Sequence, residues 1–268
     1  MILRIATLIV GVAIGAGAMA QEVKLAVTTS FHNSGLSEVL LPEIKQDLGL
    51  DVHLLVVGTG QAIRLGKAGD VDAILVHSRS AEQAFVEQGF GTHRTEIMYN
   101  DFVIVGPGSD PAQLRDANTV VEALQKIHSI NSAFVSRGDD SGTHKAEQAL
   151  WRAAGIDPQD LSTPWYRSAG AGMGAALNVA SGMNAYILSD RASWLNFGNK
   201  GDLTLLFSGD PGLFNQYAFL PVNPAKHRHV AQREVAKLEA WLTSPRAKTL
   251  INGYRLHGEA LFFFNAQP

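Results

Sequence analysis

Short apolar runs alternate with amphipathic stretches along most of the chain. The first pair is a strand pattern at residues 23–27 and a helix pattern at residues 34–48, in which Leu36, Leu40 and Ile44 share one face. The alternation continues with predicted strands at 52–57 and 73–76 and predicted helices at 61–68 and 81–88. Strands that alternate with helices in this way predict an α/β fold with a parallel sheet covered by helices.

A second series of the same kind fills the middle of the chain. It comprises predicted helices at 119–128, 142–154 and 174–180, with strands at 133–136, 165–166 and 185–188. The apolar runs Phe102–Val105 and Ala218–Val222 bound this series. We interpret them as crossovers between two lobes, each a mostly parallel sheet flanked by helices, with a ligand cleft between the lobes. The first lobe is expected at residues 22–103 plus 218–268 and the second at residues 104–217. One continuous α/β sheet is the alternative.

The N-terminus has the layout of a secretory signal peptide. Arg4 precedes an apolar run, and the small residues Ala18–Ala20 come just before the polar Gln21. We therefore predict that residues 1–20 are removed on export, with a membrane anchor as the alternative. The number of cysteines is 0, which excludes disulfides and a lipoprotein anchor. Together these features predict a soluble periplasmic protein.

Composition and charge limit the classes of molecule that the protein can bind. The chain has 268 residues, 46% of them hydrophobic, which is enough to bury one large core or two smaller ones. The formal net charge of −3 provides no basic face, so we expect no nucleic-acid partner, and any anion site must be local. No two histidines have the i, i+4 spacing of a helical metal site, so we predict no bound cation.

Four turns between a predicted strand and a predicted helix carry residues suited to an anion. In such sheets the next helix begins at the carboxyl end of the strand, where its free N–H groups can bind an anion. The first turn offers the hydroxyls of Thr29 and Ser30, the second has Thr59 between two glycines, and the fourth is a glycine-rich stretch that includes Gly172. An ordinary helix cap or tight turn would use the same residues.

The third turn, residues 136–144, combines a charge with hydroxyls and amides. Arg137 offers a planar charged fork, Ser141 and Thr143 offer hydroxyls, and Gly142 falls where the N–H groups of the next helix begin. Asp139 and Asp140 both lie close enough in sequence to pair with Arg137, and either pair would leave a helix cap without a ligand site. Both arrangements can hold together, because a carboxylate behind Arg137 would fix its orientation.

At these residues the chain resembles the tungstate-binding receptors of ABC transporters, within the type II periplasmic binding proteins. The resemblance extends over essentially the whole mature chain. Its blocks are Val57–Ala62, Asp72–His77, Met98–Gly106, Phe134–His144, Gly172–Ala175 and Leu261–Ala266. Several blocks in the right order make the resemblance specific. It implies a receptor without cofactors that captures tungstate, and molybdate as a close alternative, for a permease in the inner membrane. We expect a monomer.

The resemblance also assigns residues to the ligand. The hydroxyl segment and the arginine loop of that family fall on Thr29, Ser30, Arg137, Ser141 and Thr143 here. The family's first threonine is replaced by Val27, which can be a strand residue without loss of a donor.

Two further functions stay open. Phosphate receptors use a similar loop, whose aspartate accepts the proton of hydrogen phosphate, and Asp139 stands at that spacing. Tungstate has no such proton, so with tungstate Asp139 must point away or bind Arg137 or backbone N–H groups. The other alternative is an extracytoplasmic enzyme with Asp139, Asp140 or His144 as acid or base. Asp140–Thr143 also matches the aspartic-protease signature, but no second copy exists.

Overall fold

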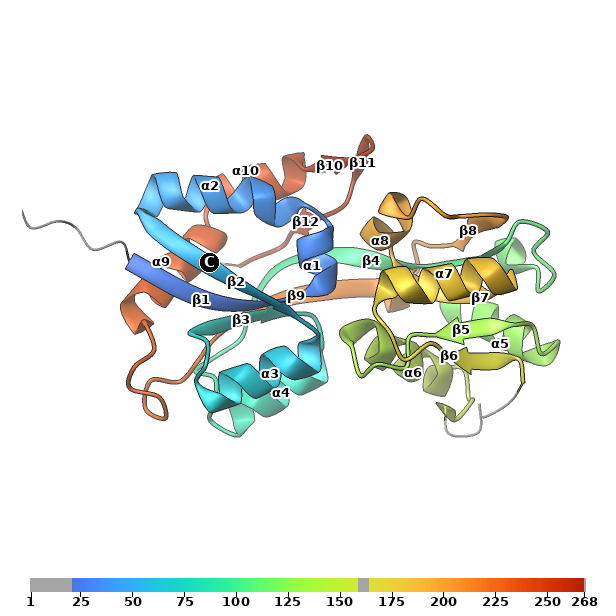
Figure 1. Cartoon of the computed structure of the whole chain (residues 1–268), viewed down its shortest axis with the longest axis horizontal. Coiled ribbons are helices and arrows are strands. Elements are labelled where there is room, and N and C mark those ends of the chain that lie inside the picture. The colour runs from blue at the N-terminus through green and yellow to red at the C-terminus, as the bar shows by residue number, and fades with distance from the viewer. Residues whose placement is uncertain (1–20, 159–163, 268) are drawn as a thin grey trace, which may run out of the picture.

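Two lobes lie side by side and are joined by two long strands, β4 (Thr95–Pro107) and β9 (Phe214–Pro221), as Figure 1 shows. The computed structural model describes residues 21–158 and 164–267, so the predicted signal peptide lies outside the described residues. Within these residues the strands of the main sheet follow the order β2-β1-β3-β9-β4-β7-β5-β6. The shared strands therefore occupy the middle of one sheet that passes through both lobes.

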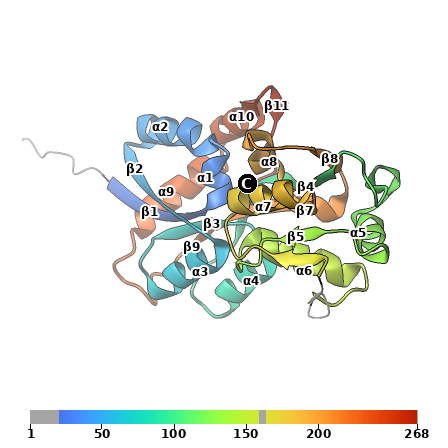
Figure 2. The same ribbon diagram turned by 45° about the vertical axis from the view of Figure 1, so that its right-hand side comes forward.

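Lobe 1 contains the N-terminal and C-terminal parts of the described chain. Its strands are β1 (Gln21–Thr28), β2 (Leu50–Val57), β3 (Ala73–Val76), β10 (Arg255–Leu256), β11 (Glu259–Ala260) and β12 (Phe263–Phe264). Its helices are α1 (Thr29–Asn33), α2 (Leu36–Leu48), α3 (Thr59–Ala68), α4 (Arg79–Glu87), α9 (Gln232–Leu242) and α10 (Pro245–Gly253). Helices α2, α9 and α10 cover one face of the sheet, and α3 and α4 cover the other (Figure 2). Because both faces are covered, β3 is buried along its whole length.

Lobe 2 is formed by the middle of the chain. Its strands are β5 (Phe134–Ser136), β6 (Tyr166–Ser168), β7 (Tyr186–Asp190) and β8 (Leu203–Phe207). Its helices are η1 (Leu114–Asp116), α5 (Val120–Ser129), α6 (Gly142–Ala153), α7 (Met173–Met183), α8 (Arg191–Asn196) and η3 (Pro211–Leu213). One hydrophobic cluster packs α5 and α6 on the sheet, and another packs α7 and α8 on its opposite face. Each lobe therefore has a sheet between two layers of helices.

The predicted fold class is confirmed, and the sheet is mixed. β1 pairs with β2 and β3 in parallel, and β5 pairs with β6 and β7 in parallel. β4 and β9 are antiparallel to each other and to the strands beside them. The antiparallel pairs arise because β4 runs from lobe 1 into lobe 2 and β9 runs back from lobe 2 into lobe 1, without a helical crossover between parallel strands.

The elements differ from the predictions mainly at loops and near the C-terminus. The predicted helix at 34–48 is preceded by a separate short helix, α1, because Gly35 has φ 81° and interrupts the helical path. The strand β8 and the helices α8 and α10 were not predicted. The predicted lobe boundaries fall inside β4 and β9, which both lobes share. α8 contributes Ala192 to a lobe 1 cluster and Trp194 to a lobe 2 cluster, so the exact division stays a prediction.

Candidate oxyanion site

The starts of α1, α3 and α7, together with the loop that leads into α6, line one cavity between the lobes. α1 and α3 begin at the carboxyl ends of β1 and β2 in lobe 1, and α6 and α7 begin after β5 and β6 in lobe 2. The residues that cap these helices are Thr28, Gly58, Ser141 and Gly172. These are the four turns that the sequence singled out, and their free N–H groups supply partial positive charge from both sides.

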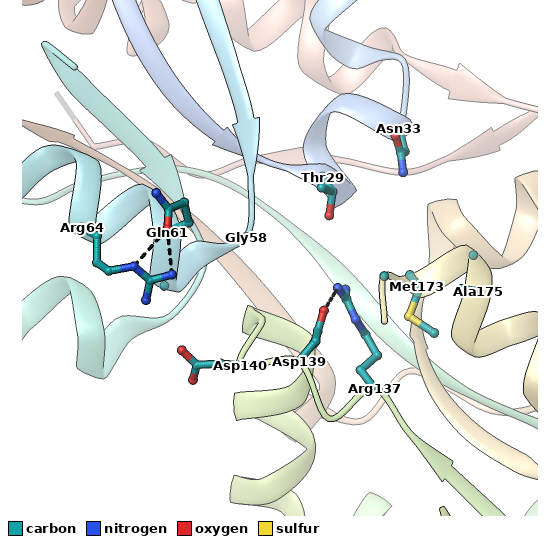
Figure 3. Close-up of a pocket in the computed structure, with 13 residues that line it drawn as sticks. Thr29, Asn33, Gly58, Gln61, Arg64, Arg137, Asp139, Asp140, Met173 and Ala175 are labelled. Atoms are coloured by element: carbon teal, nitrogen blue, oxygen red, sulfur yellow. Dashed lines mark hydrogen bonds and ion pairs between the residues drawn. The ribbon is translucent and has the colours of Figure 1, made fainter. Parts of the chain in front are cut away.

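The cavity has a volume of about 410 Å³ and opens to solvent. Three of the predicted site residues, Thr29, Arg137 and Gly172, line it. Figure 3 labels Thr29 and Arg137 at this cavity. The other lining residues are Asn33, Gly58, Gly60, Gln61, Arg64, Asp139, Asp140, Met173, Gly174 and Ala175. A tetrahedral oxyanion would fill only part of this space.

The other predicted site residues are buried and do not line the open cavity. They are Ser30, Thr59, Ser141, Gly142 and Thr143, from α1, α3 and the start of α6. Thr59 and Gly142 come from different lobes but are neighbours, because a Cβ built on Gly142 would lie 3.0 Å from Thr59 Oγ1. The structure therefore brings the starts of α3 and α6 into contact beneath the cavity.

Ser30 belongs to a buried polar network. Its Oγ lies 3.0 Å from Thr28 Oγ1, 3.0 Å from Tyr217 Oη and 3.2 Å from His77 Nε2. A hydroxyl can donate one hydrogen bond and accept two. These three partners therefore use the full capacity of the Ser30 hydroxyl, and a bond to a ligand would have to replace one of them.

Arg137 follows β5 and is almost completely buried, with 5% of its side chain exposed. Its Nη2 donates to Asp139 Oδ2, and the backbone N–H of Ser141 donates to Asp139 Oδ1 at 3.3 Å. Asp139 thus binds both Arg137 and a backbone N–H, as the sequence requires for a tungstate site. Burial opposes ionisation of Asp139, but Ser141 and Arg137 outweigh it, so the pKa of Asp139 is lower than usual.

Several buried polar side-chain atoms have no hydrogen-bond partner among the described residues, and some of them lie at the lobe interface. Among these are Thr59 Oγ1 and His77 Nδ1 in lobe 1 and Arg137 Nε in lobe 2. Most buried polar groups in folded proteins are paired, because an unpaired one costs about 1–3 kcal/mol. Thr59 and Arg137 are therefore candidate donors to an oxyanion between the lobes.

The loop that carries Arg137 has a fixed backbone path. Gly138 has φ 62°, and a Cβ at this position would lie 1.7 Å from Ser168 Oγ on β6, so only glycine fits. Asp140 has φ 59°, a conformation that aspartate tolerates better than most residues, and its carboxylate pairs with Lys145 on α6. The loop is therefore held against β6 on one side and α6 on the other.

Glu147 and His77 are buried titratable groups on opposite sides of the site. Burial raises the pKa of Glu147 on α6 to about 7, against the opposing effect of Tyr166, whose Oη donates to Glu147 Oε1 at 2.6 Å. Burial lowers the pKa of His77 to about 4, and the charge of Arg137 lowers it further. His77 is therefore neutral at pH 7.

Sequence reasoning missed several residues of this region. Asn33 and Arg64 line the cavity about one helical turn beyond the predicted turns, and Arg64 donates to Oε1 of Gln61, the last residue of the second predicted turn, at 2.8 and 3.0 Å. A lone polar residue on a helix surface gives no signal that it faces a cavity. His77 was part of a matching block, and its position directly after β3 was the available signal.

The acid–base groups of the enzyme alternative are occupied in other ways. Asp139 pairs with Arg137, Asp140 pairs with Lys145, and His144 Nδ1 accepts from the backbone N–H of Asp140 at 3.2 Å. Within residues 21–158 and 164–267, no group of three or more His, Cys, Asp or Glu residues is arranged to hold a metal ion. Over the same residues no helix is both long enough and apolar enough to span a membrane.

Comparisons with known proteins give one consistent family. The model of the PBP superfamily domain matches residues 15–246. The tungstate-binding protein TupA of Peptoclostridium acidaminophilum is 44% identical over 246 residues, which cover 90% of this chain and 85% of that protein. A putative ABC transporter anion-binding protein of Haloferax volcanii is 41% identical over 92% of this chain and 72% of its own length.

A solved structure agrees with these relatives. The tungstate-binding protein TupA from Desulfovibrio alaskensis G20 superposes with a TM-score of 0.83 at 43% identity, covering 92% of this chain and all of that one (100%). These relatives are binding proteins, which sets the enzyme alternative aside. The chain belongs to the PBP superfamily and, within it, to the family of the tungstate-binding proteins.

Proposed function

We propose that this protein is a receptor that captures tungstate between its lobes and delivers it to an ABC transporter permease. The observation that carries the proposal is the pair of buried groups without partners, Thr59 Oγ1 and Arg137 Nε, which come from opposite lobes. Four helix starts surround the same region and add N–H groups. Arg137 supplies the charge, and Thr29, Ser30, Thr59, Ser141, Gly142, Thr143 and Gly172 complete the proposed site.

The state of Asp139 favours tungstate or molybdate over phosphate. Hydrogen phosphate carries a proton that a free carboxylate could accept, whereas tungstate and molybdate do not at neutral pH. Both oxygens of Asp139 already accept hydrogen bonds, from Arg137 and from the Ser141 N–H. This arrangement supports a ligand that has no proton to donate to a carboxylate.

We further propose that the chain is exported and acts in the periplasm as a monomer. The support is the signal-peptide pattern of residues 1–20, in which Arg4 precedes an apolar run that ends in the small residues Ala18–Ala20. Determination of the N-terminal residue of the protein recovered from the periplasm checks the expected cleavage after Ala20.

Calorimetric titration of the mature protein with tungstate, molybdate, sulfate and phosphate tests the ligand. We expect tight stoichiometric binding of tungstate and much weaker binding of sulfate and phosphate. Tight binding of phosphate without a response to tungstate would overturn the proposal. A preference for molybdate would keep the site and change the ligand.

Replacement of Arg137 tests the assigned charge. Arg137→Ala removes the buried partner of a charged ligand, a loss of about 2–5 kcal/mol, so affinity should fall at least about 30-fold. Arg152→Ala is the control. Arg152 is exposed on α6, the helix that follows the Arg137 loop, and this variant should keep the wild-type affinity. If Arg137→Ala binds tungstate as the wild type does, the assignment of Arg137 is wrong.

A further inference from the structure

The imidazole ring of His77 and the backbone of Gly142 meet across the lobe interface, at the base of the proposed site. His77 follows β3 in lobe 1, and Gly142 is the first residue of α6 in lobe 2. A Cβ built on Gly142 would lie 2.4 Å from His77 Cε1 and 2.8 Å from its Nδ1. A side chain on residue 142 would therefore collide with the ring, so the two lobes approach as closely as a glycine allows.

His77 is held firmly in lobe 1. Its Nε2 lies 3.2 Å from Ser30 Oγ, its ring centroid lies 4.8 Å from that of Tyr217 on β9, and Phe102 on β4 packs at 6.4 Å. Only 9% of His77 is exposed. Close-packed interiors resist displacement, so the ring acts as a rigid support for the start of α6.

The other glycine contact between the lobes is different in kind. A Cβ on Gly60 would lie 2.7 Å from Asp140 Oδ2, but the Asp140 side chain is 69% exposed and is not enclosed by a packed core. Among the described glycines that face the other lobe, Gly142 is thus the one that meets a buried ring.

The same contact fixes the separation of the proposed ligand groups. Thr59 Oγ1 lies 3.0 Å from the Cβ position of Gly142, so it borders the contact on the lobe 1 side. Arg137 lies five residues before Gly142, in the loop that leads into α6. Any change in the distance between His77 and Gly142 therefore changes the gap between Thr59 and Arg137.

We propose that the His77–Gly142 contact is a steric stop that sets how far the lobes close and thereby selects tetrahedral oxyanions by size. Tungstate and molybdate have longer bonds to oxygen than sulfate and phosphate. With closure stopped at this contact, a large anion reaches the donors of both lobes, whereas a small anion leaves some of them unsatisfied. Selectivity then comes from a penalty on the smaller anion. This inference rests on the proposed function.

Three variants separate a steric stop from a hydrogen-bonding role. His77→Ala removes the ring, so the lobes can close further and the ratio of sulfate to tungstate dissociation constants should fall about tenfold or more. His77→Phe keeps a ring but loses the bond to Ser30, so it should keep this ratio within a few-fold even if both affinities fall. Gly142→Ala adds a methyl group against the ring and should weaken tungstate binding about tenfold or more. Gly91→Ala is the matched control, because its Cβ would press on the Phe85 ring at 2.7 Å within lobe 1.

Calorimetry with tungstate and sulfate gives the ratios, and thermal unfolding shows that each variant is folded. A fallen ratio in His77→Ala, a kept ratio in His77→Phe and an unchanged ratio in Gly91→Ala support the stop. The inference is overturned if His77→Ala weakens both anions by the same factor, or if Gly142→Ala binds tungstate like the wild type. If His77→Ala does not fold, His77→Phe and Gly142→Ala decide. A wild type that does not prefer tungstate would instead refute the proposed function.

Discussion

At the scale of single residues, the proposed site contains polar groups that have no hydrogen-bond partner among the described residues. Thr59 is 1% exposed and its hydroxyl has no partner within the described part of the chain. Thr28, in contrast, caps α1 by accepting from the Phe31 N–H at 3.3 Å. The two threonines therefore differ, because Thr28 stabilises a helix and Thr59 is a proposed ligand donor.

Thr59→Val should leave stability unchanged or slightly raised, since it removes an unsatisfied hydroxyl at nearly constant volume. Loss of a hydrogen bond to a charged ligand, about 1.5–3 kcal/mol, should weaken tungstate binding about 10- to 150-fold. Thr28→Val should lower the free energy of unfolding by about 1 kcal/mol through loss of the cap. Thermal unfolding and calorimetry measure both effects. Equal stability losses in the two variants would show that Thr59 has a structural partner.

At the scale of elements, α6 links the site to the core of lobe 2. Its first turn contributes Ser141, Gly142 and Thr143, and one turn later Glu147 is buried against Tyr166 of β6. The start of the helix was predictable from the Ser-Gly-Thr cap pattern after a strand. The burial of Glu147 was not, because a glutamate in the middle of a helix normally indicates an exposed position.

Glu147 should make stability depend on pH. Its pKa is raised from 4.5 to about 7 in the folded state, so the folded protein binds more protons than the unfolded chain between these values. This contribution to stability is therefore present at low pH and is lost as the pH rises through about 7. The total contribution is on the order of 3 kcal/mol.

His77 acts in the opposite direction over nearly the same range. Its pKa is lowered from 6.5 to about 4, so its contribution is lost as the pH falls. The test is therefore the difference between the wild type and Glu147→Gln, measured by denaturant unfolding from pH 5 to pH 8. The wild type should lose stability relative to the variant as the pH rises. Glu87→Gln, an exposed change on α4, is the control, and a constant difference for Glu147→Gln would contradict the prediction.

At the scale of the whole molecule, alternating patterns were sufficient for the two-lobed α/β fold and for the four helix starts. They could not give the direction of β4 and β9, because an apolar run has the same pattern in a parallel and in an antiparallel pair. Nor could they show that His77 meets Gly142, since such a contact depends on how two lobes are placed in space. Arg137 was predictable because charge, hydroxyls and a helix start coincide within one loop.

Hydrogen bonds of Asn196, called the rim contact below, also join the lobes. Asn196, at the end of α8, donates to the Asn33 carbonyl of α1 at 3.1 Å, and its Oδ1 lies 3.3 Å from His257 Nε2. Both partners belong to lobe 1. Because this contact joins α8 to lobe 1, we expect it to favour the state in which the lobes enclose the ligand.

Asn196→Ala should therefore weaken tungstate binding about 2- to 10-fold, mainly through faster dissociation. This range corresponds to the free energy of roughly one hydrogen bond between neutral groups. Asn199→Ala is the matched control: its amide donates to Asn178 Oδ1 at 2.9 Å inside lobe 2 and should not affect the affinity. Both side chains are exposed, so neither change should lower the melting temperature much. Stopped-flow dissociation kinetics measure the rates. Equal rates for Asn196→Ala and Asn199→Ala would mean that the rim contact does not hold the lobes together.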